Sequence, residues 1–173
     1  SDTLWFRRLL RHIQIKVMIN VNVVSEYKIW NNRLKKKIIF FNNLVKYFPL
    51  KYKFKNKKVY MTVLLSNNKN IKKLNKKFKK KNKSTNILSF PFDTKPFLKK
   101  ELYLGDIIIS YEHMNKPKFI TNIQFKKKII KIFIHGFLHL LNYDHTKLKD
   151  FKKMHYEEEK IYNLLSKKFE KFV

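Results

Sequence analysis

Hydrophobic residues along the chain follow two spacings, one typical of strands and one typical of helices. Runs rich in β-branched residues predict four strands, from Ile15 to Val24, Val59 to Leu65, Ile87 to Phe92 and Leu104 to Ser110. Pro91 cannot donate a ladder hydrogen bond, so the third strand is expected at a sheet edge or to end there. Gly105 and Asp106 supply turn or bulge chemistry in the fourth strand.

Apolar residues three or four positions apart predict helices between and after these strands. The predicted helices run from Tyr27 to Phe48, Ile71 to Phe78, Ile123 to Leu141 and Leu148 to Phe169. From Ile129 onward the third is apolar nearly all the way round, which predicts a helix buried in the core. The order of elements predicts an α/β or α+β fold with a small mixed sheet of about four strands packed with helices.

The length and amino-acid content favour one globular domain over residues 1–173, because 44% of the 173 residues are hydrophobic. No apolar run reaches the roughly 18 residues that a membrane span needs, and the opening segment is too short and too charged for a signal peptide. The absence of cysteine excludes disulfides, iron–sulfur clusters and thiol catalysis. A cytoplasmic protein without a membrane partner is therefore expected.

The charge of the chain is strongly positive, with 41 Lys and Arg against 12 Asp and Glu, a net +29. Such an excess favours a polyanionic partner, such as RNA, DNA or an anionic surface. All but four of the basic residues are Lys, a point charge without the forked geometry that reads bases. An AT-rich genome that places Lys at ordinary surface positions is the alternative explanation, and composition alone does not decide between the two.

Three of the six histidines, His135, His139 and His145, fall within eleven residues. A separation of four places His135 and His139 on one helix face, as two imidazoles that share a metal require. Asn142 suits a left-handed cap that reverses the chain and brings His145 back. Three imidazoles on a buried helix favour a shared cation, because burying polar groups unpaired is costly. Nitrogen ligands without a thiolate favour zinc, and three ligands leave a position open for catalysis.

The same histidine spacing occurs in metzincin proteases, where the residue after the first histidine is a glutamate that acts as general base. Here that residue is Gly136, which cannot accept a proton. A zinc protease is thus disfavoured. A zinc hydrolase with its base elsewhere, or with a metal that acts mainly as a Lewis acid, remains open, including a hydrolase of another ester or amide.

Three segments of the chain resemble a known family. The run from His135 to His145 resembles the HGxLHLxGYDH signature of the YbeY family, bacterial zinc-dependent endoribonucleases of ribosomal RNA maturation. Thr85 to Phe92 resembles the family's TNVLSFPF segment, and Leu104 to Ile109 its LGDI element, in the same order. The matches cover roughly Phe78 to His145.

The resemblance implies an α/β fold, zinc ligation by His135, His139 and His145, and cleavage of single-stranded precursor rRNA, with the ribosome or its subunits as partners. Asn142 replaces a family glycine, a tolerable change at a left-handed cap. Lys79 stands where the family carries an arginine thought to engage substrate. Lysine keeps the charge but loses the bidentate fork.

Further site residues are expected around the triad. Lys79, Ser89 and Asp144 are the candidate catalytic residues, and Lys80, Lys81, Thr85 and Asn86 the candidate RNA-binding residues. Each has a structural alternative: a solvated helix face for the lysines, turn formation for Thr85 and Asn86, and solvent exposure for Ser89. Asp144 either accepts a hydrogen bond from a ligand imidazole or stabilises its turn.

The last predicted helix places His155 and Glu158 on an otherwise apolar stripe. We expect Glu158 to accept the spare N–H of a zinc-binding histidine, because such ligands usually donate to a carboxylate or carbonyl. A second function also stays open, namely a ribosome-associated RNA-binding factor in which zinc is structural and cleavage is slight or absent.

Overall fold

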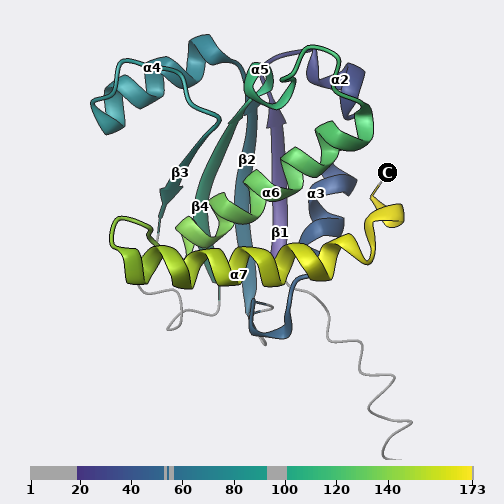
Figure 1. Ribbon diagram of the computed structural model, residues 1–173, viewed down its shortest axis with the longest axis vertical. Helices are drawn as coiled ribbons and strands as arrows, with labels where there is room; N and C mark the ends of the chain where they lie inside the picture. The colour runs from purple at the N-terminus through teal and green to yellow at the C-terminus, as the bar shows by residue number, and fades with distance from the viewer. Residues whose placement is uncertain (1–18, 53, 55–56, 93–100, 173) are drawn as a thin grey trace, which may run out of the picture.

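The computed structural model describes residues 19–52, 54, 57–92 and 101–172 and is built on a four-stranded sheet (Figure 1). The strands are β1 (Ile19–Ser25), β2 (Lys58–Ser66), β3 (Ile87–Pro91) and β4 (Glu101–Ser110), in the spatial order β1-β2-β4-β3. β1, β2 and β4 are parallel, whereas β3 is antiparallel to β4. The predicted small mixed sheet is confirmed, with β3 at an edge and ending at Pro91. Residues 15–18 of the predicted first strand lie outside the described residues.

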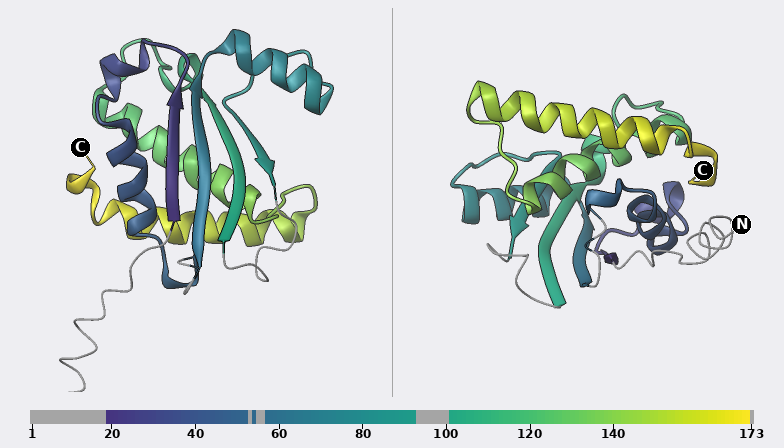
Figure 2. Two further views of the ribbon diagram at one scale, coloured as in Figure 1. Left: turned by 180° about the vertical axis from the view of Figure 1, so that it is seen from behind. Right: turned by 90° about the horizontal axis from the view of Figure 1, so that it is seen from below.

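The helices are α2 (Trp30–Arg33), α3 (Lys37–Lys46), α4 (Asn68–Lys79), α5 (Tyr111–Met114), α6 (Asn122–Leu140) and α7 (Leu148–Ser166), with short 3-10 turns η1 (Leu50–Tyr52) and η2 (Phe169–Lys171). α6 lies across one face of the sheet and α7 lies outside α6 (Figure 2). α3 lies along the edge strand β1. Phe41 of α3 and Phe48 just after it contact Phe133 and Phe137 of α6, with ring centroids 5.2 and 4.8 Å apart. None of the helices that the structure describes is long and apolar enough to cross a membrane.

α6 is the buried helix that the sequence predicts. It begins in a capping box between Thr121 and Gln124, which satisfies free N–H groups of the first turn. Nine of its residues are buried, among them Phe125, Phe133 and Phe137. This central position, between the sheet and α7, holds the residues at its C-terminal end firmly in place.

α4 belongs to a separate small cluster, which joins Ile71 of the helix to Leu88 and Ile108 of the sheet. Ile107 and Ile109 belong to the main core, so the alternation along β4 puts this cluster on the opposite sheet face. The basic helix expected from Ile71 to Phe78 is confirmed. It ends where Lys80 adopts a left-handed conformation, φ 58°.

The continuous helix predicted from Tyr27 to Phe48 is wrong, because the structure has two helices with a bend at Leu34. Trp30 is fully buried and donates its indole N–H to the carbonyl oxygen of Ser66, 2.9 Å away at the end of β2. α3 instead lies along β1, where the Asn42 side chain bonds the backbone N–H and carbonyl of Val21. The two segments are tied to different places, and one straight helix cannot satisfy both.

Gly105 forms a bulge within β4, as its chemistry predicts. The register against β2 shifts between Tyr60 and Thr62. Gly105 has φ 132°, and a Cβ atom there would lie 2.1 Å from the carbonyl oxygen of Phe90. The strand starts at Glu101 rather than at the predicted Leu104, because pairing with β2 continues on both sides of the bulge.

Candidate metal centre

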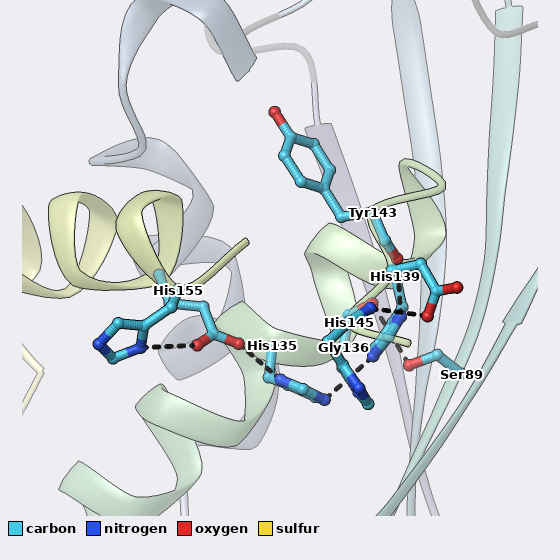
Figure 3. Close-up of polar contacts among 9 residues, drawn as sticks. Ser89, His135, Gly136, His139, Tyr143, His145 and His155 are labelled. Carbon is cyan, nitrogen blue, oxygen red and sulfur yellow. Dashed lines mark hydrogen bonds and ion pairs between the residues drawn. The ribbon is translucent and has the colours of Figure 1, made fainter. Parts of the chain in front are cut away.

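The structure brings together the three histidines that the sequence selects (Figure 3). His135 and His139 lie one turn apart on α6, with their Nε2 atoms 3.0 Å apart. The His145 ring comes from the turn after α6, and its centroid lies 5.4 Å from that of His135 and 5.0 Å from that of His139. One nitrogen from each ring lies within 4.8 Å of the others, a spacing that suits a shared metal ion.

The turn after α6 depends on Asn142, whose φ of 64° is the left-handed conformation that the sequence predicts. The Asn142 N–H donates to the His139 carbonyl oxygen at 2.9 Å, and the Tyr143 N–H donates to that of Leu138 at 3.0 Å. These bonds satisfy carbonyls at the helix end and reverse the chain. The reversal carries His145 back to the pair.

Hydrogen bonds at the Nδ1 atoms set the tautomers of His135 and His139. The Nδ1 atom of His139 lies 2.9 Å from the Tyr143 carbonyl oxygen, which can only accept, so this nitrogen carries the proton. The Nδ1 atom of His135 lies 2.5 Å from Oε1 of Glu158 and donates in the same way. In neutral rings both Nε2 atoms then present lone pairs to each other. A cation between them relieves this repulsion, so the donor set fits a metal.

The ionisation states also suit a metal. Burial, and next the neighbouring His135, lower the pKa of His139 and favour the neutral ring that binds metal. Burial alone would raise the pKa of Glu158, but the hydrogen bond and charge of His135, together with those of His155, outweigh it and leave that pKa below its ordinary value. Near neutral pH, Glu158 is therefore a carboxylate that accepts from a ligand imidazole, as the sequence predicts.

The triad forms one wall of a groove, here called the metal groove, between the end of β3, the loop after α4 and the turn after α6. Predicted site residues that line it are Lys79, Lys81, Thr85, Asn86, Ser89 and Asp144. Lys80 is exposed and does not line the groove. The loop that carries Lys81 is fixed to α4, because the buried Asn75 donates to the Lys83 carbonyl oxygen at 2.8 Å.

Gly136 and Ser89 lie where α6 meets β3. A Cβ atom on Gly136 would come 2.6 Å from Cδ1 of Ile87 and 3.0 Å from Oγ of Ser89. The Ser89 hydroxyl donates to the Gly136 carbonyl oxygen at 3.3 Å (Figure 3). Ser89 is half-buried at the groove rather than solvated, so its position suits the predicted catalytic role, which stays a prediction.

The contacts of Asp144 favour the second of its two expected roles. Its carboxylate accepts from the His145 backbone N–H at 2.7 Å and from the Thr146 hydroxyl at 2.8 Å. The Thr146 hydroxyl, followed by the His145 N–H, lowers the pKa of this exposed carboxyl. Asp144 thus stabilises the turn that presents His145, while a direct catalytic role stays a prediction.

Three other predicted residues have identifiable neighbours. The Nζ atom of Lys79 lies 5.7 Å from the ring centroid of Phe90, a cation–π contact that keeps the ammonium group beside β3. The Thr85 hydroxyl donates to the Asn86 side-chain oxygen at 3.3 Å. This bond agrees with the turn alternative, although both side chains also line the metal groove.

A buried polar cluster next to the site was missed by sequence reasoning. The carboxylate of Glu157 accepts from the Tyr52 hydroxyl and the Lys51 ammonium group, each at 2.6 Å. The Tyr52 hydroxyl also lies 3.4 Å from that of Tyr143, whose carbonyl orients His139. Consecutive residues on a helix point in different directions, so Glu157 could not share the surroundings of Glu158. This difference was the only feature of the sequence that could have indicated a separate polar contact for Glu157.

The fold and the site together define a mixed α/β protein with a group of three histidines that could hold a metal ion, set in a lysine-lined groove. The family model described as Endoribonuclease YbeY matches residues 20–166. The chain belongs to the YbeY endoribonuclease family. This membership confirms the resemblance that the motifs carry and the expected enzyme class, a nuclease hydrolase that acts on RNA.

Curated relatives cover most of the chain. The Endoribonuclease YbeY of Pelagibacter ubique is 60% identical over 151 residues, 87% of this chain and 99% of that protein. The one from Ehrlichia canis is 36% identical over 133 residues, 77% of this chain and 83% of that protein. A solution structure from Thermotoga maritima matches with a TM-score of 0.42 and 21% identity, covering 86% of this chain and 93% of that one.

Proposed function

We propose that this chain is a zinc-dependent endoribonuclease that cuts single-stranded RNA during the maturation of precursor rRNA in the cytoplasm, working on ribosomes or their subunits. The observation that carries the proposal is the convergence of three imidazole nitrogens within 4.8 Å on the wall of a groove lined by Lys79 and Lys81. Family membership supports RNA as the substrate.

The choice of zinc follows from the ligands. His135, His139 and His145 offer three nitrogens and no thiolate, and the hydrogen bonds at Nδ1 of the first two direct their Nε2 atoms inward. When bound, zinc would polarise the scissile phosphate or lower the pKa of a bound water toward about 7. His145 is exposed while its partners are half-buried, so a metal held by the three nitrogens would be accessible from the metal groove.

The groove residues explain how RNA would be held. The ammonium groups of Lys79, Lys81 and Lys83 offset phosphate charge. Among the described residues that line the groove, Asp144 alone is acidic, and it is held by its own turn. His135 and His139 are half-buried within the groove wall. A flexible single strand reaches such recessed groups more easily than a duplex, whose bases are stacked and paired.

The alternative, an RNA-binding factor with a structural zinc, is less well supported by the turn after α6. Backbone bonds from Asn142 and Tyr143, together with the side chain of Asp144, hold this turn without a metal. A structural zinc usually supplies the folding energy of its site. We therefore expect the metal-stripped protein to stay folded and to lose turnover.

The test is cleavage of a labelled single-stranded rRNA fragment by the wild type, by His139→Ala and by His113→Ala as a matched histidine control outside the metal groove. All three proteins are purified at high salt to remove adhering nucleases. Cleavage by the wild type and His113→Ala, but not by folded His139→Ala, supports a catalytic metal. Equal cleavage by all three overturns it, and binding of RNA without cleavage favours the alternative function.

A further inference from the structure

A second pocket opens on the far side of His135 from the metal groove, between α6 and α7. Its volume is about 460 Å³, within the range of small-molecule sites. We call it the side pocket. Its apolar lining comes from Met114, Ile132, Ile134 and Tyr162.

The side pocket is continuous with the metal groove, since Asn86 and His135 line both. A strand whose phosphate lies against the histidine triad can therefore place an adjoining nucleotide at the mouth of this pocket. Asn86 is exposed at that junction, and its amide can donate and accept hydrogen bonds.

The charges around the side pocket do not suit a phosphate. Lys128 and Lys131 are matched by Glu158 and Glu159, in a chain whose net charge is +29. The Lys128 ammonium group already donates to the carbonyl oxygens of His113 and Lys116, at 2.9 and 2.6 Å. The balance of charge, unlike the lysine excess elsewhere, is not explained by a general bias toward lysine.

The apolar lining suits a flat, uncharged group. Met114 and Ile134 are buried, and Ile132 and the ring of Tyr162 are half-buried. The Lys131 ammonium group lies 4.8 Å from the Tyr162 ring centroid, a cation–π contact within the pocket lining. Nucleobases unstacked from a single strand are commonly received by such aromatic and aliphatic surfaces.

We propose that the side pocket binds the nucleobase of a nucleotide that adjoins the scissile phosphate. The proposal deepens and rests on the proposed function, because it takes the triad as the place where the phosphate lies. It assigns to Ile132, Tyr162 and Met114 a substrate-positioning role. Base binding there would fix the register of the strand against the metal.

The experiment is an abasic scan of a short single-stranded RNA, in which each nucleotide in turn lacks its base. Binding to the zinc-loaded protein by fluorescence anisotropy and cleavage are both measured. The proteins are the wild type, Ile132→Trp, which fills the pocket, and Ile123→Trp, the same change on an exposed position of α6 outside it. Zinc content and melting temperature confirm that each variant is folded.

In the wild type and Ile123→Trp we expect one abasic position to weaken binding by roughly 5- to 150-fold, which corresponds to the usual contribution of one base stacked on an aromatic side chain. In Ile132→Trp the intact RNA should bind about as weakly as the abasic RNA, so the abasic effect disappears. Tyr162→Ala, which removes a wall, should act in the same direction and replaces Ile132→Trp if that variant does not fold.

An abasic effect that persists unchanged in both pocket variants, or no sensitive position at all, overturns the side pocket as a base site. Its failure is distinguishable from that of the proposed function. If the wild type cleaves RNA but no abasic position weakens binding, the base-binding role of the side pocket is wrong and the proposed function stands. A sensitive position in the binding assay, abolished by Ile132→Trp, supports the pocket even when no RNA is cut.

Discussion

His135 on α6 and Glu158 on α7 are joined across the two helices, with Nδ1 of the first 2.5 Å from Oε1 of the second. Glu158 also lies 3.7 Å from Nδ1 of His155, so it is held from two sides. Through this contact the outermost helix orients a ring of the metal centre. α7 is thus part of the site, although it supplies none of the three ligand nitrogens.

Glu158→Gln should lower zinc affinity by about 10- to 100-fold, the usual effect of removing a partner of a metal-binding histidine. The amide keeps the size of the side chain but removes the charge that holds the His135 proton on Nδ1. Competition with a chromogenic chelator at neutral pH measures the affinity. Glu159→Gln is the matched control, because this neighbour is exposed. Equal affinities in Glu158→Gln and wild type would contradict the assignment.

Gly136→Ala should destabilise the protein by about 1–3 kcal/mol, the usual cost of overpacking a tight contact. The new Cβ would lie 2.6 Å from Cδ1 of Ile87, so either that side chain or α6 must shift. Urea unfolding measures the loss. In an Ile87→Val background, which lacks Cδ1, the same glycine change should cost less. An equal cost in both backgrounds would place the strain elsewhere.

Much of the fold could be predicted because its elements carry clear local signals. Asn142 takes the left-handed conformation, Gly105 makes a bulge and Pro91 ends an edge strand, each for reasons internal to the residue. The bend at Leu34 could not be predicted, because it depends on the bond from Trp30 to Ser66. Residues 36 positions apart in the chain leave no trace in helical periodicity.

The candidate site likewise has features that the sequence predicts and features that it does not. Histidine spacing on one helix brings His135 and His139 together, and the cap at Asn142 explains His145. The cluster of Glu157 with Lys51 and Tyr52 joins segments more than a hundred positions apart, and spacing could not reveal it. Continuity of the metal groove with the side pocket likewise arises only when helices and strands have packed.

Neutralising Lys79 and Lys81 should flatten the dependence of RNA affinity on salt. Each backbone phosphate contact to a single strand contributes roughly 0.7 to the slope of log affinity against log salt. Lys79→Gln and Lys81→Gln should each reduce the slope by up to about that amount, because both residues line the metal groove. Lys80→Gln is the control, since Lys80 does not. If all three variants keep the wild-type slope, none of these lysines contacts the RNA backbone and the run is a solvated surface.

Lys79→Arg should raise the turnover of single-stranded RNA and change KM little. The substitution keeps the charge near Phe90 and adds the planar fork that binds two phosphate oxygens at once. Initial rates over a range of RNA concentrations separate the two parameters. Turnover at or below the wild-type value would show that Lys79 supports cleavage as well as an arginine at this position.

Glu157→Gln should destabilise the protein at neutral pH and progressively less in acid. Burial would raise the pKa of Glu157, but bonds from Lys51 and Tyr52 outweigh it and hold that pKa below its ordinary value of 4.5. A carboxyl whose pKa is depressed by folding contributes stability that is complete above the unfolded pKa and is lost as pH falls through the folded pKa. The difference in unfolding free energy between wild type and variant, measured in urea, should therefore shrink as pH falls below about 4.5. Exposed Glu170→Gln is the control, and a difference independent of pH would show that the carboxylate charge contributes nothing there.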